Sequence, residues 1–115
     1  MLGALIETAN GKLYGTTSLG GASDKGVIFE YDYITGIYDV KISFDGIIGG
    51  NPCGSLTYAA NGKLYGMAKI GGNSGYGVIF EYDYITNNYL KKFDFNGSNG
   101  KFPQATLIQA SNGKL

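Results

Sequence analysis

The stretch Gly26-Val-Ile-Phe-Glu-Tyr-Asp-Tyr-Ile-Thr35 recurs unchanged as Gly77-Val-Ile-Phe-Glu-Tyr-Asp-Tyr-Ile-Thr86, 51 residues later (77 − 26 = 51). A second motif keeps this spacing: Asn10-Gly-Lys-Leu-Tyr-Gly15 returns as Asn61-Gly-Lys-Leu-Tyr-Gly66 and begins again at Asn112-Gly-Lys-Leu115. A period of about 50 residues is typical of a repeated supersecondary unit. The chain is therefore divided into a first repeat at 1–53, a second at 54–104 and the first strand of a third at 105–115.

Each full repeat predicts four β-strands and no helix. The apolar, β-forming runs are short, are bounded by turn residues and show no helical period with caps. Twenty glycines also disfavour helix. The expected strands are 4–9, 13–17, 27–31 and 38–44 in the first repeat, and 55–60, 64–68, 78–82 and 89–95 in the second.

Asn-Gly at 10–11 and at 61–62 predicts a tight hairpin between the first two strands. We expect a type I′ turn, in which both central residues have positive φ. The glycine-rich segments 20–26 and 71–77 differ in their interiors, so we interpret them as connections outside the framework.

Asp32 and Asp83 predict a second kind of turn, between the third and fourth strands. An aspartate carboxylate can accept hydrogen bonds from backbone N–H groups two or three residues ahead. The fifth residue of this motif is Gly36 in one repeat and Asn87 in the other. Both residue types tolerate the left-handed backbone, so we expect positive φ there.

The third strand of each repeat is apolar on both sides. Val27, Phe29 and Tyr31 would point one way and Ile28 the other, whereas a strand with one buried face alternates more cleanly. We therefore expect stacked sheets. Four antiparallel strands in simple order per repeat predict an all-β fold of β-propeller blades, two complete and a third begun. A β-solenoid and a sandwich of two four-stranded sheets are the alternatives.

Three motif pieces resemble a known repeat family. Leu13-Tyr-Gly-Thr-Thr-Ser-Leu-Gly-Gly21, Gly26-Val-Ile-Phe-Glu-Tyr-Asp32 and Asn51-Pro-Cys-Gly-Ser-Leu56 are similar to the GloVer tandem repeat of bacterial choice-of-anchor proteins. The second copy departs from it at Met67-Ala-Lys69, where the family usually has Thr-Thr-Ser. The resemblance implies a secreted or cell-surface bacterial protein with propeller-like arrays, and it implies no catalytic residues.

A more distant similarity is to kelch blades, which share Tyr-Asp-x-x-Thr-Gly/Asn followed by an aromatic residue. Tyr38 and Tyr89 stand near the position at which kelch repeats carry Trp. Propeller blades rely on neighbours to cover their faces. We therefore expect further blades of a longer chain as partners, or a homo-oligomeric ring of about three or four chains with six to eight blades. The redundant strand at 105–115 favours the longer chain, unless that strand is exchanged between neighbours.

Composition excludes several classes of function. Nine acidic and nine basic residues give zero net charge without a basic patch, which disfavours nucleic acid and anionic membranes as partners. No run of apolar residues is long enough to span a bilayer, and the first residues lack the pattern of a signal peptide. Histidine is absent, which excludes Ser-His-Asp and Cys-His nucleophiles and His-ligated metals within the chain.

Cys53 is the single cysteine, so it forms no internal disulfide and no zinc site built on Cys pairs. We expect it to be a half-buried residue of a connection. Glu30 and Glu81 suggest the carboxylate pair of a glycosidase. Because they hold the same place in successive repeats, we interpret each as the cross-strand partner of a lysine.

No metal, cofactor or catalytic residue is predicted. Asp32 and Asp83 lack the acidic loop of a calcium site, and the 20–26 segment is followed by no helix that would make it a phosphate loop. The tyrosines Tyr33, Tyr76 and Tyr84 fall in turns or loops, where they could stack on a sugar ring or anchor a protein contact. The first hypothesis is a non-enzymatic scaffold, and the alternative is a carbohydrate-binding propeller that uses these tyrosines. A third is a hydrolase with its catalytic groups on other blades.

Overall fold

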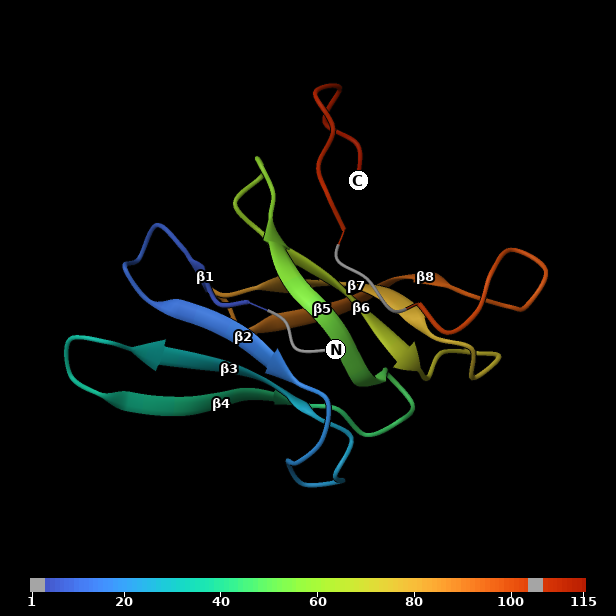
Figure 1. Ribbon diagram of the computed structural model, residues 1–115, viewed down its shortest axis with the longest axis horizontal. Coiled ribbons are helices and arrows are strands. Elements are labelled where there is room, and N and C mark those ends of the chain that lie inside the picture. The colour runs from blue at the N-terminus through green and yellow to red at the C-terminus, as the bar shows by residue number, and fades with distance from the viewer. Residues whose placement is uncertain (1–3, 104–106) are drawn as a thin grey trace.

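The computed structural model describes residues 4–103 and 107–115. These residues form two antiparallel four-stranded sheets and no helix (Figure 1). Sheet 1 contains β1 (Ile6–Glu7), β2 (Leu13–Thr17), β3 (Val27–Asp32) and β4 (Ile37–Ser43) in chain order. Sheet 2 contains β5 (Gly50–Tyr58), β6 (Leu64–Ile70), β7 (Val78–Asp83) and β8 (Asn88–Asp94). The predicted all-β class is confirmed, with one four-stranded meander in each repeat.

The Asn-Gly hairpins form, but the predicted turn type is wrong. At the glycines Gly11 and Gly62 φ is 79° and 82°, whereas the asparagines have negative φ. The N–H of Gly11 donates to the carbonyl of Thr8 at 3.0 Å, and the N–H of Thr8 donates to the carbonyl of Lys12 at 3.1 Å. This pattern is a three-residue loop, a type I turn followed by a left-handed glycine. Asn10 acts instead through its side chain, whose Oδ1 accepts the N–H of Lys12 at 3.0 Å.

The Asx-turns are confirmed. Oδ1 of Asp32 accepts the N–H groups of Ile34 at 3.0 Å and Thr35 at 3.2 Å. The second repeat forms the same two bonds. The predicted positive φ is also found, at 77° for Gly36 and 59° for Asn87.

Strand β5 begins at Gly50, five residues before the expected start at Ser55. Cys53 therefore lies in a strand and not in a connection, although it is half-buried as expected. Pro52 is tolerated because β5 is an edge strand of sheet 2. The unit boundary read from the sequence between residues 53 and 54 thus falls inside β5, and the expected start of the third repeat at residue 105 lies outside the described residues.

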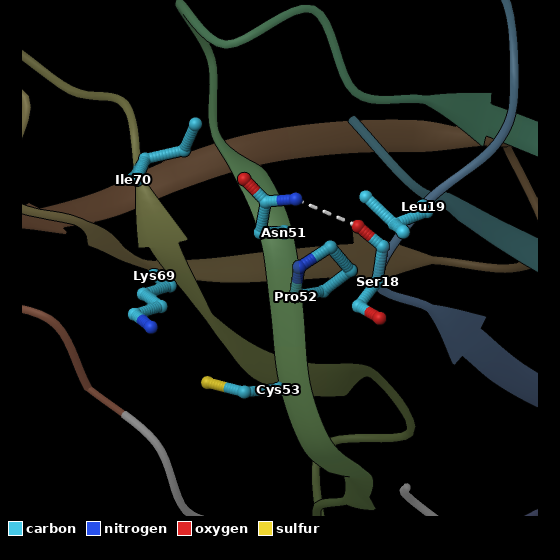
Figure 2. A pocket seen from close by; sticks show the side chains of 7 residues that line it. All are labelled: Ser18, Leu19, Asn51, Pro52, Cys53, Lys69 and Ile70. Carbon is cyan, nitrogen blue, oxygen red and sulfur yellow. Dashed lines mark hydrogen bonds between the residues drawn. The ribbon is translucent and has the colours of Figure 1, made fainter. Parts of the chain in front are cut away.

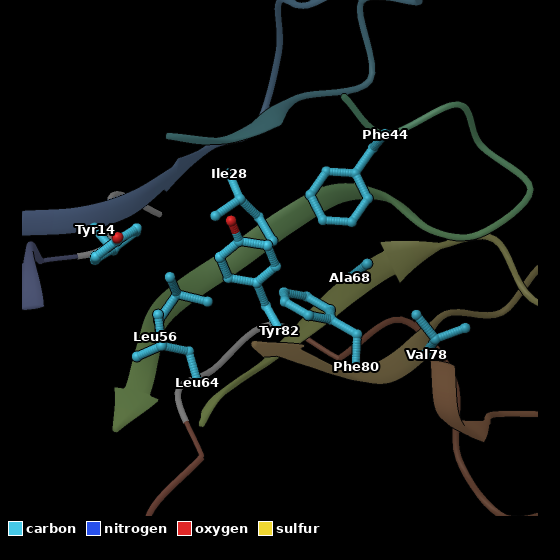
Figure 3. Close-up of a cluster of buried hydrophobic side chains, with 9 residues drawn as sticks. All are labelled: Tyr14, Ile28, Phe44, Leu56, Leu64, Ala68, Val78, Phe80 and Tyr82. Carbon is cyan, nitrogen blue, oxygen red and sulfur yellow. The ribbon is translucent and has the colours of Figure 1, made fainter. Parts of the chain in front are cut away.

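The two sheets pack on each other through unlike faces (Figure 3). Side chains alternate between the two sides of a strand, and the register groups them into a front face and a back face. The front face carries Tyr14, Ile28 and Ile42 in sheet 1, and Tyr65, Ile79 and Phe93 in sheet 2. The back face carries Leu13, Phe29 and Tyr38 in sheet 1, and Leu64, Phe80 and Tyr89 in sheet 2. The front face of sheet 1 meets the back face of sheet 2.

Aromatic rings fill the core between the sheets. The ring of Phe44, which follows β4, meets the edge of Phe80 at a centroid distance of 5.5 Å and that of Tyr89 at 5.7 Å. The hydroxyl of Tyr89 donates to the carbonyl of Ile48 at 2.7 Å. Each aromatic pair adds roughly 0.5–1.5 kcal/mol to the burial of its surface. The core therefore joins the two repeats.

The first strands of the two sheets also lie side by side near the middle of the molecule (Figure 1). The N–H of Ala4 donates to Oγ of Ser55 at 2.6 Å, and the N–H of Ala9 donates to the hydroxyl of Tyr58 at 3.2 Å. The segment 107–115 lies beside β5 in the same way that β5 lies beside β1. The N–H of Ala60 donates to Oε1 of Gln109 at 2.9 Å, as the N–H of Ala9 does to the hydroxyl of Tyr58. Successive repeats are therefore arranged around their first strands.

Cover on both faces of the third strand was expected, and within the described residues each sheet is covered on one face. In β3 the front residue Ile28 is buried and the back residue Phe29 is half-buried. In β7 the order is reversed, because Phe80 is buried and Ile79 is half-buried. The back face of sheet 1 and the front face of sheet 2 are left open.

Candidate interaction surface

The open back face of sheet 1 has the same side-chain arrangement as the buried back face of sheet 2. In sheet 1 the ring of Phe29 lies over Gly15 and 5.2 Å from the ring of Tyr38. In sheet 2 the ring of Phe80 lies over Gly66 and 5.3 Å from that of Tyr89. Yet Tyr38 is 53% exposed where its counterpart Tyr89 is half-buried, and Phe29 is half-buried where its counterpart Phe80 is fully buried. The open face is therefore a formed apolar surface that lacks a neighbour within the described residues.

The open front face of sheet 2 corresponds in the same way to the buried front face of sheet 1. Phe95 takes the place of Phe44, and it is half-buried where Phe44 is fully buried. Phe93 takes the place of Ile42 and is 43% exposed. The rings of Phe93 and Phe95 pack edge to face at 5.4 Å. Adjacent exposed apolar side chains, unlike a single exposed one, are typical of a contact surface.

A polar cluster is repeated on the two front faces. In sheet 1 the hydroxyl of Tyr14 donates to Oε2 of Glu30 at 2.5 Å, and Nδ2 of Asn10 donates to that hydroxyl at 3.1 Å. The ammonium of Lys12 lies 3.5 Å from Oε1 of Glu30. Burial, reinforced by the bond to Glu30, raises the pKa of Tyr14 above its ordinary value. The cluster is fully hydrogen-bonded, so it fixes the hairpin against β3.

The second repeat contains the same cluster, and the interpretation of the two glutamates as lysine partners is confirmed. Nζ of Lys63 lies 3.7 Å from Oε1 of Glu81, and the hydroxyl of Tyr65 donates to Oε2 at 2.5 Å. Glu30 faces sheet 2, whereas Glu81 lies on the front face of sheet 2, which points away from sheet 1. The two carboxylates therefore do not share one site.

Two of the predicted binding tyrosines, Tyr33 and Tyr84, occupy equivalent turns but differ in their surroundings. The ring of Tyr84 packs on that of Tyr14 at 5.4 Å, and its hydroxyl lies 2.8 Å from that of Tyr58. It thus belongs to the contact between the sheets. Tyr33 is 52% exposed, and its hydroxyl donates to Oε2 of Glu7 at 3.2 Å, which raises its pKa. Its exposure is what an interface residue without a neighbour would show.

Tyr76, the third predicted tyrosine, lies in the β6–β7 connection, apart from the β3–β4 and β7–β8 turns that carry the other two. Its ring meets that of Phe102 edge-on at 5.6 Å, and the ammonium of Lys101 lies 5.5 Å from its centre. The structure thus does not gather the three tyrosines into one site.

An open hollow of about 440 Å³ lies between the ends of β2 and β6 and the start of β5 (Figure 2). Across it, Nδ2 of Asn51 donates to the carbonyl of Ser18 at 2.8 Å. The thiol of Cys53 lies against the carbonyl of Pro103, and burial raises its pKa. A protonated thiol is a poor nucleophile. The lining residues are Ser18, Leu19, Asn51, Pro52, Cys53, Lys69 and Ile70.

The contacts that the glycine-rich segments make with Pro52, with Pro103 and with the linker between β4 and β5 (residues 44–49) were not predicted from the sequence. A Cβ on Gly26 would lie 2.8 Å from Cδ of Pro52, and one on Gly77 would lie 2.7 Å from Cδ of Pro103. The N–H of Gly72 donates to the carbonyl of Ile47 at 2.9 Å. The glycine-rich segments are therefore part of the framework. The signal that could have predicted these contacts is the equal separation in sequence between Gly26 and Pro52 and between Gly77 and Pro103.

Within residues 4–103 and 107–115, no group of three or more Cys, Asp or Glu side chains is placed to hold a metal ion. The same residues contain no helix that could cross a membrane. Comparison with curated proteins and with solved structures finds no match. Comparison with protein families matches residues 2–115 to the Gloeobacter/Verrucomicrobia repeat.

Proposed function

Because the chain belongs to the Gloeobacter/Verrucomicrobia repeat family over residues 2–115, its function is to be sought in how its repeats combine. We propose that the chain is a non-catalytic scaffold module in which each four-stranded sheet acts as one blade of a β-propeller. The observation that carries this proposal is the packing of the front face of one sheet on the back face of the next. Such a contact can be repeated from unit to unit.

The outer surfaces favour blades over a closed sandwich. In a sandwich, the outward residues of each strand are polar. Here the outer faces carry Tyr38, Val40 and Phe93, each more than two-fifths exposed. The adjacent first strands also support radial repetition, in which every blade begins near a common axis.

The cellular setting comes from the family resemblance. We place the module in a secreted or cell-surface bacterial protein, where its loops provide surface for contacts. Non-catalytic action is supported by the two glutamate clusters, whose carboxylates are hydrogen-bonded and ion-paired on separate faces.

The stacking is tested by the matched variants Phe80→Ala and Phe29→Ala, which change equivalent positions of the two back faces. At a protein concentration that keeps the chain monomeric, Phe80→Ala should lower the free energy of unfolding by about 3–5 kcal/mol. Phe29→Ala should cost clearly less, because its ring is only half-buried. Denaturant titration measures both values. Equal losses would contradict packing through unlike faces.

The carbohydrate alternative is tested in parallel on a glycan array. We expect no glycan to bind the wild-type chain. Specific binding that is lost in Tyr33→Ala, with thermal stability unchanged, would favour the lectin hypothesis over the scaffold. Turnover of a glycoside substrate by the chain would overturn its non-catalytic role.

A further inference from the structure

We propose that the open front face of sheet 2 binds the open back face of sheet 1 of a second copy of this chain. The inference rests on the proposed function, because it treats the contact inside the chain as the pattern that copies reuse. Unlike faces make a heterologous contact, which leaves one open face at each end of a dimer. Assembly therefore continues until a ring closes or the free faces are used up.

The front face of sheet 2 offers the groups that the internal contact requires. Tyr65 and Glu81 reproduce the bonded pair of Tyr14 and Glu30, with the same oxygen–oxygen distance of 2.5 Å. Phe95 is held like Phe44, because its N–H donates to the carbonyl of Gly77 at 3.0 Å. The corresponding bond of Phe44 is 2.9 Å. The receiving surface is therefore already in the conformation that binds a back face.

The back face of sheet 1 is the matching surface. In the internal contact, Tyr89 packs on Phe44 and donates to the carbonyl of Ile48. Tyr38 occupies the position of Tyr89, so in the second copy it would pack on Phe95. Its hydroxyl would reach the carbonyl of Asn99, which is the counterpart of Ile48. Burial of these rings supplies the main driving force.

The connection after β8 repeats two backbone hydrogen bonds of the connection from β4 into β5. Gly97 donates to Gly100 at 2.9 Å, as Gly46 does to Gly49 at 2.9 Å. Phe102 has a φ of 51° and donates to the carbonyl of Tyr76 at 2.7 Å. At the equivalent position near the start of β5, Asn51 has a φ of 47°, and its N–H donates to the carbonyl of Lys25 at 2.7 Å. The chain after β8 is thus delivered to the position of a next first strand.

The segment 107–115 occupies that position and belongs to neither sheet. It repeats residues 5–13, which include β1, so both segments cannot pair with the same β2. β1 pairs with β2 at only two positions, Ile6 with Tyr14 and Glu7 with Leu13. In the assembly, residues 107–115 therefore replace β1 beside β2 of the second copy, in the register of β5 on β6.

The experiment blocks one face at a time. Tyr38→Asp places a charge on the back face of sheet 1, and Phe93→Asp places one on the front face of sheet 2. Both side chains are exposed in the single chain. Each variant should therefore keep the circular dichroism of the wild type, and also its melting temperature when both are measured at a concentration at which they are monomeric. Val40→Asp is a second back-face variant if Tyr38→Asp fails to fold. Ile85→Asp is the control, because Ile85 and its counterpart Ile34 are both exposed, at 79% and 82%.

Mass in solution, measured by light scattering and native mass spectrometry, gives the answer. The wild-type chain and Ile85→Asp should form complexes larger than the 12.2 kDa monomer. Tyr38→Asp and Phe93→Asp should each be monomeric alone. Mixed together they should give one-to-one dimers and nothing larger, because each retains the face that the other lacks. The register is tested in a Cys53→Ser background, where Leu13→Cys in one chain and Gln109→Cys in the other should form an intermolecular disulfide.

Three outcomes would overturn the proposal. A wild-type chain that stays monomeric at high concentration removes the second copy as the partner. Dimers of Tyr38→Asp alone would mean that like faces associate. A complex without the disulfide would refute the exchange of residues 107–115. If the chain is monomeric while Phe80→Ala still costs more than Phe29→Ala, this inference fails and the proposed function stands.

Discussion

Gly71 and Gly20 hold the same place in their repeats, but only one of them has a close neighbour. Their φ angles are similar, at 96° and 91°. A Cβ on Gly71 would lie 2.5 Å from the Cα of Gly49, whereas nothing lies within 4 Å of the corresponding point at Gly20. In both repeats, glycine at this position allows a left-handed backbone. In the second repeat it also allows the linker between β4 and β5 to approach closely.

These two glycines separate the two costs experimentally. Gly20→Ala should lower the free energy of unfolding by roughly 1–2 kcal/mol, the cost of a left-handed non-glycine residue. Gly71→Ala should lose the same amount and a further 1–3 kcal/mol or so, because the linker must move. Urea titration measures both variants. Equal losses would show that the approach of the linker does not contribute.

Acid stability depends on the aspartates of the turns. Hydrogen bonds from the N–H groups of Thr35 and Ile34 lower the pKa of Asp32 below its ordinary value of 3.8. Those from Ile48 and Ile47 do the same for the pKa of Asp45. A carboxylate with a lowered folded pKa stabilises the protein above the unfolded pKa, and this contribution is lost as the pH falls through the folded pKa.

We therefore expect stability to decline as the pH falls from about 4. The double variant Asp32→Asn and Asp45→Asn keeps an acceptor oxygen in each turn and removes the titrating groups. Its stability should change less with pH over this range. Melting temperatures measured across the range compare the two proteins, and an unchanged acid slope in the variant would rule these aspartates out.

The strands and the aspartate turns could be predicted because their causes are local. Alternation, turn residues and repetition identified all eight strands of the two sheets, and the largest error was the start of β5, which lies five residues earlier than expected. The hairpin type was missed because Asn-Gly fits two loop lengths, and the side-chain bond of Asn10 to Lys12 selects the longer one. The alternation of side chains along a strand also shows which residues share a face of the sheet, but not which face packs against the other sheet. The role of Tyr84 in the core follows from packing between repeats, which the local pattern does not contain.

The contact between β8 and the preceding linker can be probed at a single oxygen atom. Tyr89→Phe removes the hydroxyl that donates to the carbonyl of Ile48. The free energy of unfolding should fall by roughly 0.5–1.5 kcal/mol. Tyr38→Phe, the same change at the exposed counterpart, should stay within about 0.5 kcal/mol of the wild type at a protein concentration at which both are monomeric, because its proposed bond to Asn99 forms only between copies. Calorimetry or denaturant titration distinguishes them, and a larger loss for Tyr38→Phe would contradict the assignment.

The molecule as a whole has one core shared by two sheets, and three tyrosines that lie in or against the core report on it. Tyr14 belongs to sheet 1, and Tyr82 and Tyr89 belong to sheet 2. Burial raises the pKa of all three above the ordinary value of 10.0, with the bond to Glu30 adding to the effect at Tyr14. A group whose folded pKa is raised gives stability that is complete below its unfolded pKa and is lost as the pH rises towards the folded value.

Alkaline titration should therefore unfold both sheets together above about pH 10. The exposed tyrosines should ionise first, in the range of free tyrosine. The buried ones should ionise only with unfolding, so the last rise in tyrosinate absorbance should coincide with the loss of circular dichroism. A smooth single ionisation of all ten tyrosines, with the sheets intact, would contradict the shared core.

The unlike faces of each sheet give any assembly of these repeats a direction. One end always presents the side with Tyr38, and the other always presents the side with Phe93. Growth at the two ends is then chemically distinct, so changing the exposed face of one terminal unit would stop growth at that end and leave the other end free.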